Sequence, residues 1–117
     1  LHDSPHIDVG NLHEYDYDYQ NSNMIESPHF EPCLKAMYNL NKVLIVGEVG
    51  IHSGDNCRTS RDKRADVMKE KFDIYIGMGA GAVFVWNLAK EGRGCGHTFN
   101  QQDPLYSTVV NYPANKR

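Results

Sequence analysis

The stretch Val43-Leu-Ile-Val-Gly-Glu-Val-Gly-Ile51 decides the fold that we expect for this chain. It opens with four aliphatic residues and shows no polar alternation. Such a run is typical of a strand buried on both faces, as in a parallel sheet covered by helices. Glu48 stands where the apolar run ends, and a buried acid must be hydrogen-bonded, paired or functional. Ligands and catalytic residues gather at the carboxyl ends of parallel strands, so Glu48 is the first candidate functional residue.

Composition places the chain among ordinary globular domains. The 117 residues are 40% hydrophobic and 23% charged, which argues against disorder. A net charge of −3 argues against a nucleic-acid partner, which usually requires a basic face. No apolar run approaches the roughly 18 residues that span a membrane, so no membrane span is predicted. The chain begins at Leu1 in polar, loop-like sequence, without Met or a signal peptide, and we expect a piece of a longer protein.

Strand-like and helix-like patterns alternate along residues 1–117, which we treat as one partial domain with a polar tail at 113–117. Strands are predicted near 6–12, 43–48 and 82–86. The first predicted helix starts at Ser27-Pro28, and its apolar face contains Phe30, Cys33, Leu34, Met37 and Tyr38. The second is capped by Thr59 or Ser60, ends near Gly77 or Gly79, and carries the stripe Ala65, Met68, Phe72 and Ile76. The third starts at Asp103-Pro104.

The order of these elements predicts an α/β fold with parallel strands, because no hairpin signal joins one strand to the next. The strand ends at His13, Glu48 and Trp86 are about 35 to 38 residues apart, close to the roughly 31 residues per β/α unit of a TIM barrel. A dinucleotide-binding unit is not predicted. The glycine-rich stretch Gly77-Met-Gly-Ala-Gly81 precedes a strand rather than following one.

Three strand-end motifs resemble those of glycoside hydrolase family 5, the cellulase- and mannanase-like TIM-barrel enzymes. They are His13-x-Tyr15, Val46-Gly-Glu48-Val-Gly50 and Val83-Phe-Val-Trp86-Asn87, in the order of that family's sixth, seventh and eighth strands. The resemblance covers roughly residues 6 to 112 and implies the last three β/α units of a TIM (β/α)8 barrel.

The resemblance implies a role for each of these side chains. Glu48 would be the nucleophile of a retaining β-glycosidase, and Trp86 the floor of a sugar-binding site. Tyr15 would hold the Glu48 carboxylate by a hydrogen bond, and His13 could bind a sugar hydroxyl. The family's general acid/base is a Glu preceded by Asn, and no such pair occurs in this chain. Retaining hydrolysis needs two carboxyl groups about 5–5.5 Å apart, so the second must come from outside the chain.

Each of these residues also has a purely structural interpretation. Glu48 could be a buried carboxylate paired with an Arg or Lys from a strand that lies outside this chain, and Trp86 could be a core aromatic. His13 and Tyr15 could be packing residues. Glu14 and His52 stand next to strand ends and could line a cleft, although such residues are more often solvated loop residues.

Metal-binding patterns are weak. Asp16-x-Asp18 lacks the glycine of a calcium-binding EF-hand loop, and the six His residues include neither HExxH nor a close pair. The sequence therefore predicts no metal and no cofactor.

Three cysteines leave at least one thiol unpaired. Cys57 and Cys95 follow two adjacent parallel strands and would lie on the same face of the implied barrel. A disulfide between them would stabilise the fold by a few kcal/mol and would fit a secreted or extracellular enzyme. Two free loop thiols in a reducing compartment are the alternative. Cys33 is predicted to be a core thiol.

The function that this resemblance implies is retaining hydrolysis of an oligosaccharide, polysaccharide or glycoconjugate, with a carbohydrate substrate as partner. A companion segment or chain would complete the barrel. One alternative is a non-catalytic glycan-binding or structural subunit derived from such a barrel. Another is an unrelated α/β fragment in which Glu48 is structural.

Overall fold

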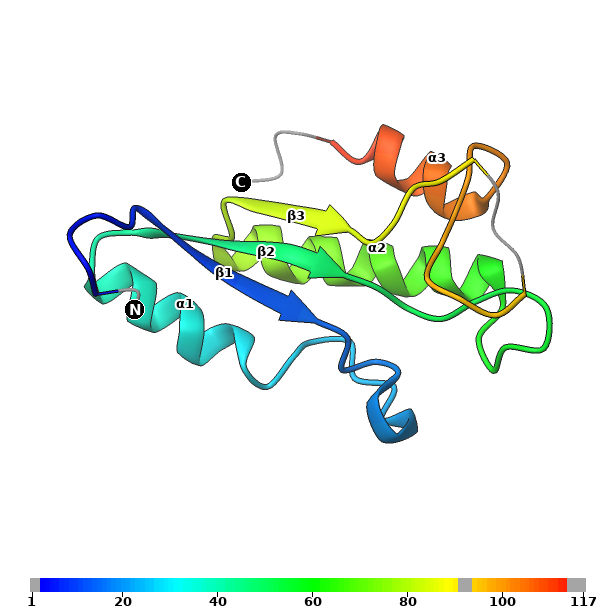
Figure 1. Ribbon diagram of the computed structural model, residues 1–117, viewed down its shortest axis with the longest axis horizontal. Coiled ribbons are helices and arrows are strands. Elements are labelled where there is room, and N and C mark those ends of the chain that lie inside the picture. Colours follow the sequence, from blue (N-terminus) through cyan, green and yellow to red (C-terminus); the bar gives the residue numbers. More distant parts are fainter. Residues whose placement is uncertain (1–2, 91–93, 114–117) are drawn as a thin grey trace.

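A computed structural model describes residues 3–90 and 94–113 of the chain. These residues form, in order, β1 (Val9–Glu14), α1 (Phe30–Asn39), β2 (Val43–Val49), α2 (Arg61–Met78), β3 (Ala82–Val85) and α3 (Pro104–Asn111), with a short 3-10 helix at Tyr19–Asn21. The strands form one parallel sheet in the order β1-β2-β3 (Figure 1). The predicted α/β fold with parallel strands is therefore confirmed. Of the predicted polar tail, only Pro113 lies within the described residues.

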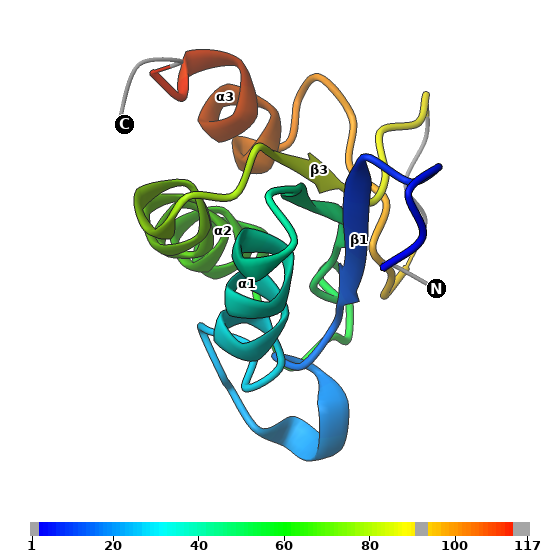
Figure 2. The ribbon, with the colours of Figure 1, turned by 90° about the vertical axis from the view of Figure 1, so that its left-hand side faces the viewer.

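Helices cover only one face of the sheet. Figure 2 shows α1 and α2 on the same side of the strands, and α3 lies beside α2. The core between helices and sheet contains, among others, Phe30, Met37, Leu44, Val46, Val67, Met68, Phe72 and Tyr75. Val43 of β2 is 49% exposed and Phe84 of β3 is 55% exposed. Trp86, which follows β3 directly, is 46% exposed. The expectation that the middle strand is covered on both faces is thus wrong for the described chain, because its helices pack on one side only.

Local sequence explains where the helices begin and end. The Ser60 side chain accepts a hydrogen bond from the Lys63 N–H at the start of α2, and Asp103 accepts one from the Leu105 N–H at the start of α3. Gly79 ends α2 with a φ of 114°, a left-handed conformation that glycine adopts without strain. These three predicted termini are confirmed.

The first helix and first strand differ from their predictions. α1 begins at Phe30 rather than at Ser27-Pro28, and the buried Ser27 hydroxyl accepts a hydrogen bond from the His29 N–H instead. Tyr38 is 82% exposed and not on the buried face, because it follows the buried Met37 by one residue and is turned about 100° away. β1 runs from Val9 to Glu14, so it starts and ends later in the chain than the predicted strand at 6–12.

A bulge in β2 controls the direction of the Glu48 side chain. Leu12 pairs with Val46, but the next residue, His13, pairs with Glu48, so Gly47 is an extra residue on β2. Leu44 and Val46 are buried toward the helices, and strict alternation would place Glu48 among them. The extra residue moves Glu48 to the uncovered face, opposite His13. A Cβ on Gly47 would lie 2.1 Å from Oδ1 of Asn11, so a larger residue at the bulge would have to displace that exposed side chain.

No helix among residues 3–90 and 94–113 has both the length and the apolar character needed to cross a membrane.

Candidate functional site

Three of the predicted site residues meet at the carboxyl end of the sheet. The Tyr15 hydroxyl donates a 2.7 Å hydrogen bond to Oε2 of Glu48. Nδ1 of His13 lies 3.4 Å from the same oxygen, and the Glu48 side chain is 27% exposed. Within the described chain Glu48 thus contacts a hydroxyl and an imidazole. The carboxylate is held by hydrogen bonding and remains accessible from the uncovered face.

The two partners of Glu48 differ in their own surroundings. Burial, the hydrogen bond to Glu48 and the charge of that carboxylate together raise the pKa of Tyr15, so its hydroxyl keeps its proton and remains a donor at neutral pH. His13 is half exposed, and its Nε2 lies 3.1 Å from Nδ2 of Asn11 on the same face of β1. Asn11 therefore orients the imidazole, which remains open to an incoming group.

Trp86 reaches the same edge from β3. Its backbone N–H donates to the Val49 carbonyl, and the residue is 46% exposed rather than packed in the core. The peptide bond between Trp86 and Asn87 is cis. Gly50 brings the strand ends together: a Cβ there would lie 2.7 Å from the Tyr15 ring, 3.0 Å from His97 and 3.2 Å from the Trp86 carbonyl. Only a residue without a side chain lets these groups approach so closely.

Glu14, a candidate cleft residue, has a structural role instead. Its carboxylate and the Lys71 ammonium are fully buried, with Nζ 2.9 and 3.0 Å from the two oxygens. Lys71 also donates to the Met24 and Ile25 carbonyls. The alternation of β1 turns Glu14 toward α2, away from the face that carries His13. The pair ties the loop after β1 to the helix layer.

His52, the other cleft candidate, belongs to a second cluster at the same edge. Its Nδ1 lies 3.4 Å from Oδ2 of Asp18, and Nε2 of His97 lies 3.5 Å from that oxygen. The two imidazoles are stacked, with centroids 3.8 Å apart. Burial alone would raise the pKa of Asp18. The net effect is a lower pKa, because the carboxylate contacts the His97 ring, accepts a hydrogen bond from the backbone N–H of His52 and is attracted by the charge that both rings can carry. Asp18 is therefore an ionised acceptor at neutral pH.

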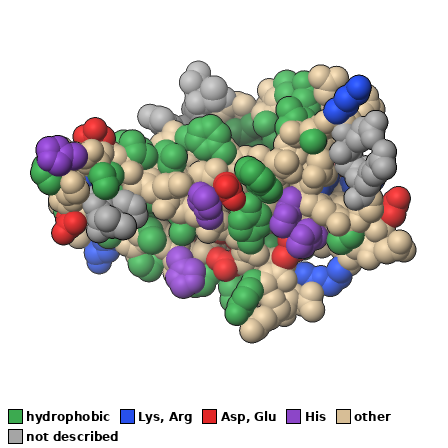
Figure 3. All heavy atoms as spheres, in the orientation of Figure 1, with side chains coloured by type: hydrophobic (Ala, Val, Ile, Leu, Met, Phe, Trp, Pro, Cys, Tyr) green, Lys and Arg blue, Asp and Glu red, His purple; other side chains and the backbone are tan. Residues whose placement is uncertain are grey.

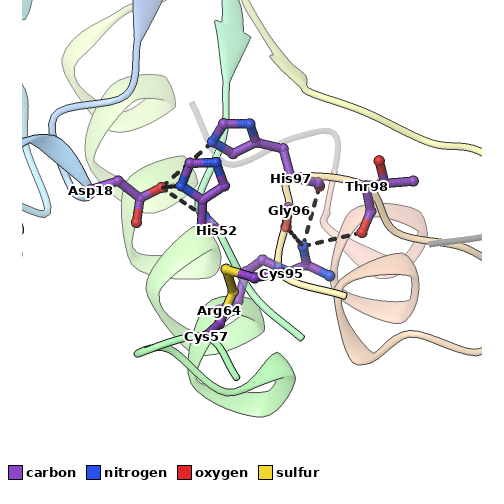
Figure 4. Close-up of a disulfide and its surroundings, with 8 residues drawn as sticks. All are labelled: Asp18, His52, Cys57, Arg64, Cys95, Gly96, His97 and Thr98. Carbon is purple, nitrogen blue, oxygen red and sulfur yellow. Dashed lines mark hydrogen bonds and ion pairs between the residues drawn. A yellow bond between two sulfur atoms is a disulfide. The ribbon is translucent and has the colours of Figure 1, made fainter. Parts of the chain in front are cut away.

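The loops that carry this cluster are cross-linked. Cys57 and Cys95 form the predicted disulfide between the loops after β2 and β3, beside the two His residues (Figure 4). The Arg64 guanidinium, almost completely buried, donates from Nη1 to the carbonyls of Gly96, His97 and Thr98. Its Nη2 lies 2.6 Å from the Asp103 carboxylate. Cys33 is a free thiol that is partly buried against the core.

Sequence reasoning placed Glu48, Tyr15, His13 and Trp86 at one edge of the sheet, and the structure brings the first three into contact. It missed Asn11, the clustering of Asp18 with His52 and His97, and the Arg64–Asp103 pair. The two His residues are 45 positions apart, so no local spacing reveals them. The available signal was topological: each follows a parallel strand, and the carboxyl ends of parallel strands meet.

Comparisons of the chain with models of protein families, with curated proteins and with solved structures found no match.

Proposed function

We propose that this chain supplies the nucleophile half of a retaining β-glycosidase of the family 5 type. The observation that carries the proposal is the Glu48 carboxylate, which accepts a 2.7 Å hydrogen bond from Tyr15 at the end of a parallel strand. A nucleophilic carboxylate must be ionised and aimed, and a hydroxyl donor that keeps its proton serves both needs. The partly exposed Trp86 indole offers a flat apolar surface for a sugar ring.

The arrangement of the sheet supports a position within a larger barrel. Strands in sequential order, with both connecting helices on one face, are what three consecutive units of a (β/α)8 barrel present. In such a barrel the uncovered face would be filled by side chains from the other strands. Val43 and Phe84 on this face, and Leu88 and Val110 beyond β3, are exposed apolar side chains that a companion segment or chain would cover.

The companion would also supply the general acid/base, because the chain contains no Asn-Glu pair. Retaining hydrolysis would then place the second carboxyl group about 5–5.5 Å from Glu48. The carbohydrate would bind across the carboxyl ends of the strands, between Trp86 and His13. The Cys57–Cys95 disulfide is of the kind that persists in oxidising compartments, which supports a secreted or extracellular location.

A 2-fluoroglycosyl fluoride tests the proposal on the natively purified protein together with whatever co-purifies with it. Fluoride leaves without help from a general acid, so the probe reports on the nucleophile alone. We expect a stoichiometric mass increase on a peptide containing Glu48. Glu48→Gln should abolish the labelling, and Glu26→Gln, an exposed glutamate in a loop, should leave it unchanged. Labelling that survives in Glu48→Gln, or none on a preparation whose native mass includes a companion, contradicts the proposal.

A non-catalytic glycan-binding subunit is the second candidate, and the missing acid/base favours it. In that case oligosaccharides quench the Trp86 fluorescence, since Trp86 is the only tryptophan, while no covalent label forms. Trp86→Phe would remove the quenching but not the fold.

A further inference from the structure

Asp18, His52 and His97 bring three potential metal ligands together from three different loops. Asp18 follows β1, His52 follows β2, and His97 lies in the connection from β3 to α3, so the cluster joins all three strand ends. One ligand atom from each residue lies within 4.8 Å of the other two. Figure 4 shows both imidazoles directed toward the same carboxylate.

The spacing of these atoms suits a small divalent ion. Zinc binds imidazole nitrogen and carboxylate oxygen at about 2.0–2.2 Å, so two ligands of a tetrahedral site lie about 3.4 Å apart. Nδ1 of His52 and Nε2 of His97 lie 3.4 and 3.5 Å from Oδ2 of Asp18. These two separations are too long for good hydrogen bonds and match two edges of such a tetrahedron. Because imidazole nitrogens bind metals in the plane of the ring, the two stacked rings would turn out of their stack to coordinate one ion.

The nitrogen of His97 lacks another partner. Among the described residues its Nε2 is enclosed and makes no hydrogen bond. Within that part of the chain its one polar contact is the 3.5 Å approach to Oδ2 of Asp18, and a coordinated ion would give this buried nitrogen a full partner. A hydrogen bond between the stacked rings cannot do so, because their planes are only 17° from parallel.

The surrounding structure holds the loops that carry these ligands in place without an ion. Ser53 and Gly96, neighbours of the two His residues, exchange backbone hydrogen bonds of 2.9 and 3.1 Å, which sets the imidazoles side by side. The disulfide and the Arg64 guanidinium fix the same loops. The backbone N–H of His52 donates to Oδ2 of Asp18 at 2.6 Å. This hydrogen bond orients the carboxylate, as an outer hydrogen bond does in a metal site.

We propose that Asp18, His52 and His97 bind one divalent transition-metal ion, with Zn²⁺ as the preferred occupant. Two imidazoles and one carboxylate suit zinc and its neighbours, whereas calcium and magnesium require oxygen ligands. Three protein ligands leave a fourth position for water. The ion would clamp the loop of Asp18, which the disulfide does not reach, to the two cross-linked loops. Since the Tyr15 ring lies 5.0 Å from that of His97, the clamp would also steady the donor to Glu48.

Titration of the chelator-treated, disulfide-intact protein with Co²⁺ tests this site directly. Tetrahedral Co²⁺ with nitrogen ligands absorbs visible light, so we expect a band that saturates at one equivalent and disappears when Zn²⁺ is added. Zn²⁺ should also raise the melting temperature. His52→Ala, His97→Ala and Asp18→Asn should each weaken binding at least tenfold, as the loss of a ligand exceeds the roughly 10–100-fold effect of losing an outer partner.

His29→Ala and His6→Ala serve as matched controls, because both remove an exposed imidazole outside the cluster. They should keep the full affinity and the Zn²⁺-dependent shift in melting temperature. Circular dichroism and a thiol assay confirm that each variant is folded and oxidised. If a ligand variant fails to fold, the proposal is tested by the Zn²⁺-dependent shift in melting temperature of the wild-type protein and the two controls. The proposal is overturned by the absence of a saturating one-to-one signal, or by binding that survives substitution of all three residues.

Discussion

Glu14 and Lys71 are opposite charges that are both completely enclosed by the fold. Burial raises the pKa of Glu14 and lowers that of Lys71, and in each case the attraction of the partner opposes the shift without cancelling it. Removing one partner of a buried pair leaves an uncompensated charge and costs about 3–5 kcal/mol. Lys71→Met should therefore lower the free energy of unfolding by that amount.

The double variant Glu14→Gln/Lys71→Met should recover part of this loss, because no buried charge remains. Lys69→Met on the same helix is the matched control: that lysine is 58% exposed and its pair with Asp73 contributes less than about 0.5 kcal/mol. Urea unfolding of the four proteins measures the differences. If Lys71→Met costs no more than Lys69→Met, the pair does not have the role assigned here.

The residues of the candidate site could be predicted only to the point where strand ends meet. The positions of Glu48, Tyr15 and His13 could be predicted because each stands at the end of a predicted strand. The β2 bulge could not be predicted, because Gly47 looks like one more strand residue in the sequence. It nevertheless decides which face Glu48 occupies. Glu14 shows the converse. Its strand-end position resembled that of Glu48, but alternation directs it to Lys71, a charged residue on the buried face of α2.

At the scale of elements, Asp103 joins two helices. Oδ1 caps α3 through the Leu105 N–H, while Oδ2 pairs with the buried Arg64 of α2. Asp103→Asn keeps a capping oxygen but removes the charge, so it should cost about 3–5 kcal/mol, as for other broken buried pairs. Ser60→Ala removes only a cap and should cost about 1 kcal/mol. Chemical denaturation compares the two, and equal losses would mean that Asp103 acts as a cap alone.

Helix boundaries could be predicted where a capping residue alone sets the end of the helix. Ser60, Gly79 and Asp103 did what their residue types favour. Ser27 and Pro28 lie just before α1: Pro28 and His29 form a turn, and the helix begins at Phe30. The Ser27 N–H donates to the Tyr75 hydroxyl within the core. Such a contact spans 48 positions and cannot be deduced from neighbours in the sequence.

At the scale of the whole molecule, the uncovered sheet face dominates the behaviour expected in solution. Figure 3 shows hydrophobic side chains interspersed with His and acidic ones across this face. We expect the isolated chain to self-associate, because exposed apolar surface beside unpaired strand edges favours it. Val43→Lys/Phe84→Lys should reduce association without lowering the melting temperature, since both side chains are about half exposed.

Sedimentation velocity over a range of concentrations measures this effect. Tyr19→Lys is the control, because Tyr19 is 66% exposed in the 3-10 helix outside the sheet, and its substitution should not change association. A wild-type chain that stays monomeric at the highest concentration would mean that the uncovered face does not cause self-association.

The Cys57–Cys95 bond has a consequence for how this molecule would look after proteolysis. It closes a ring that contains α2 and β3. Cutting one peptide bond inside the ring opens it without releasing a fragment, so the nicked product keeps its mass, apart from one added water, until a reductant is present. A reducing gel would then display two polypeptides where one covalent molecule existed. A genuine companion chain is distinguished because it separates under denaturing, non-reducing conditions, before the sulfur bridge is broken.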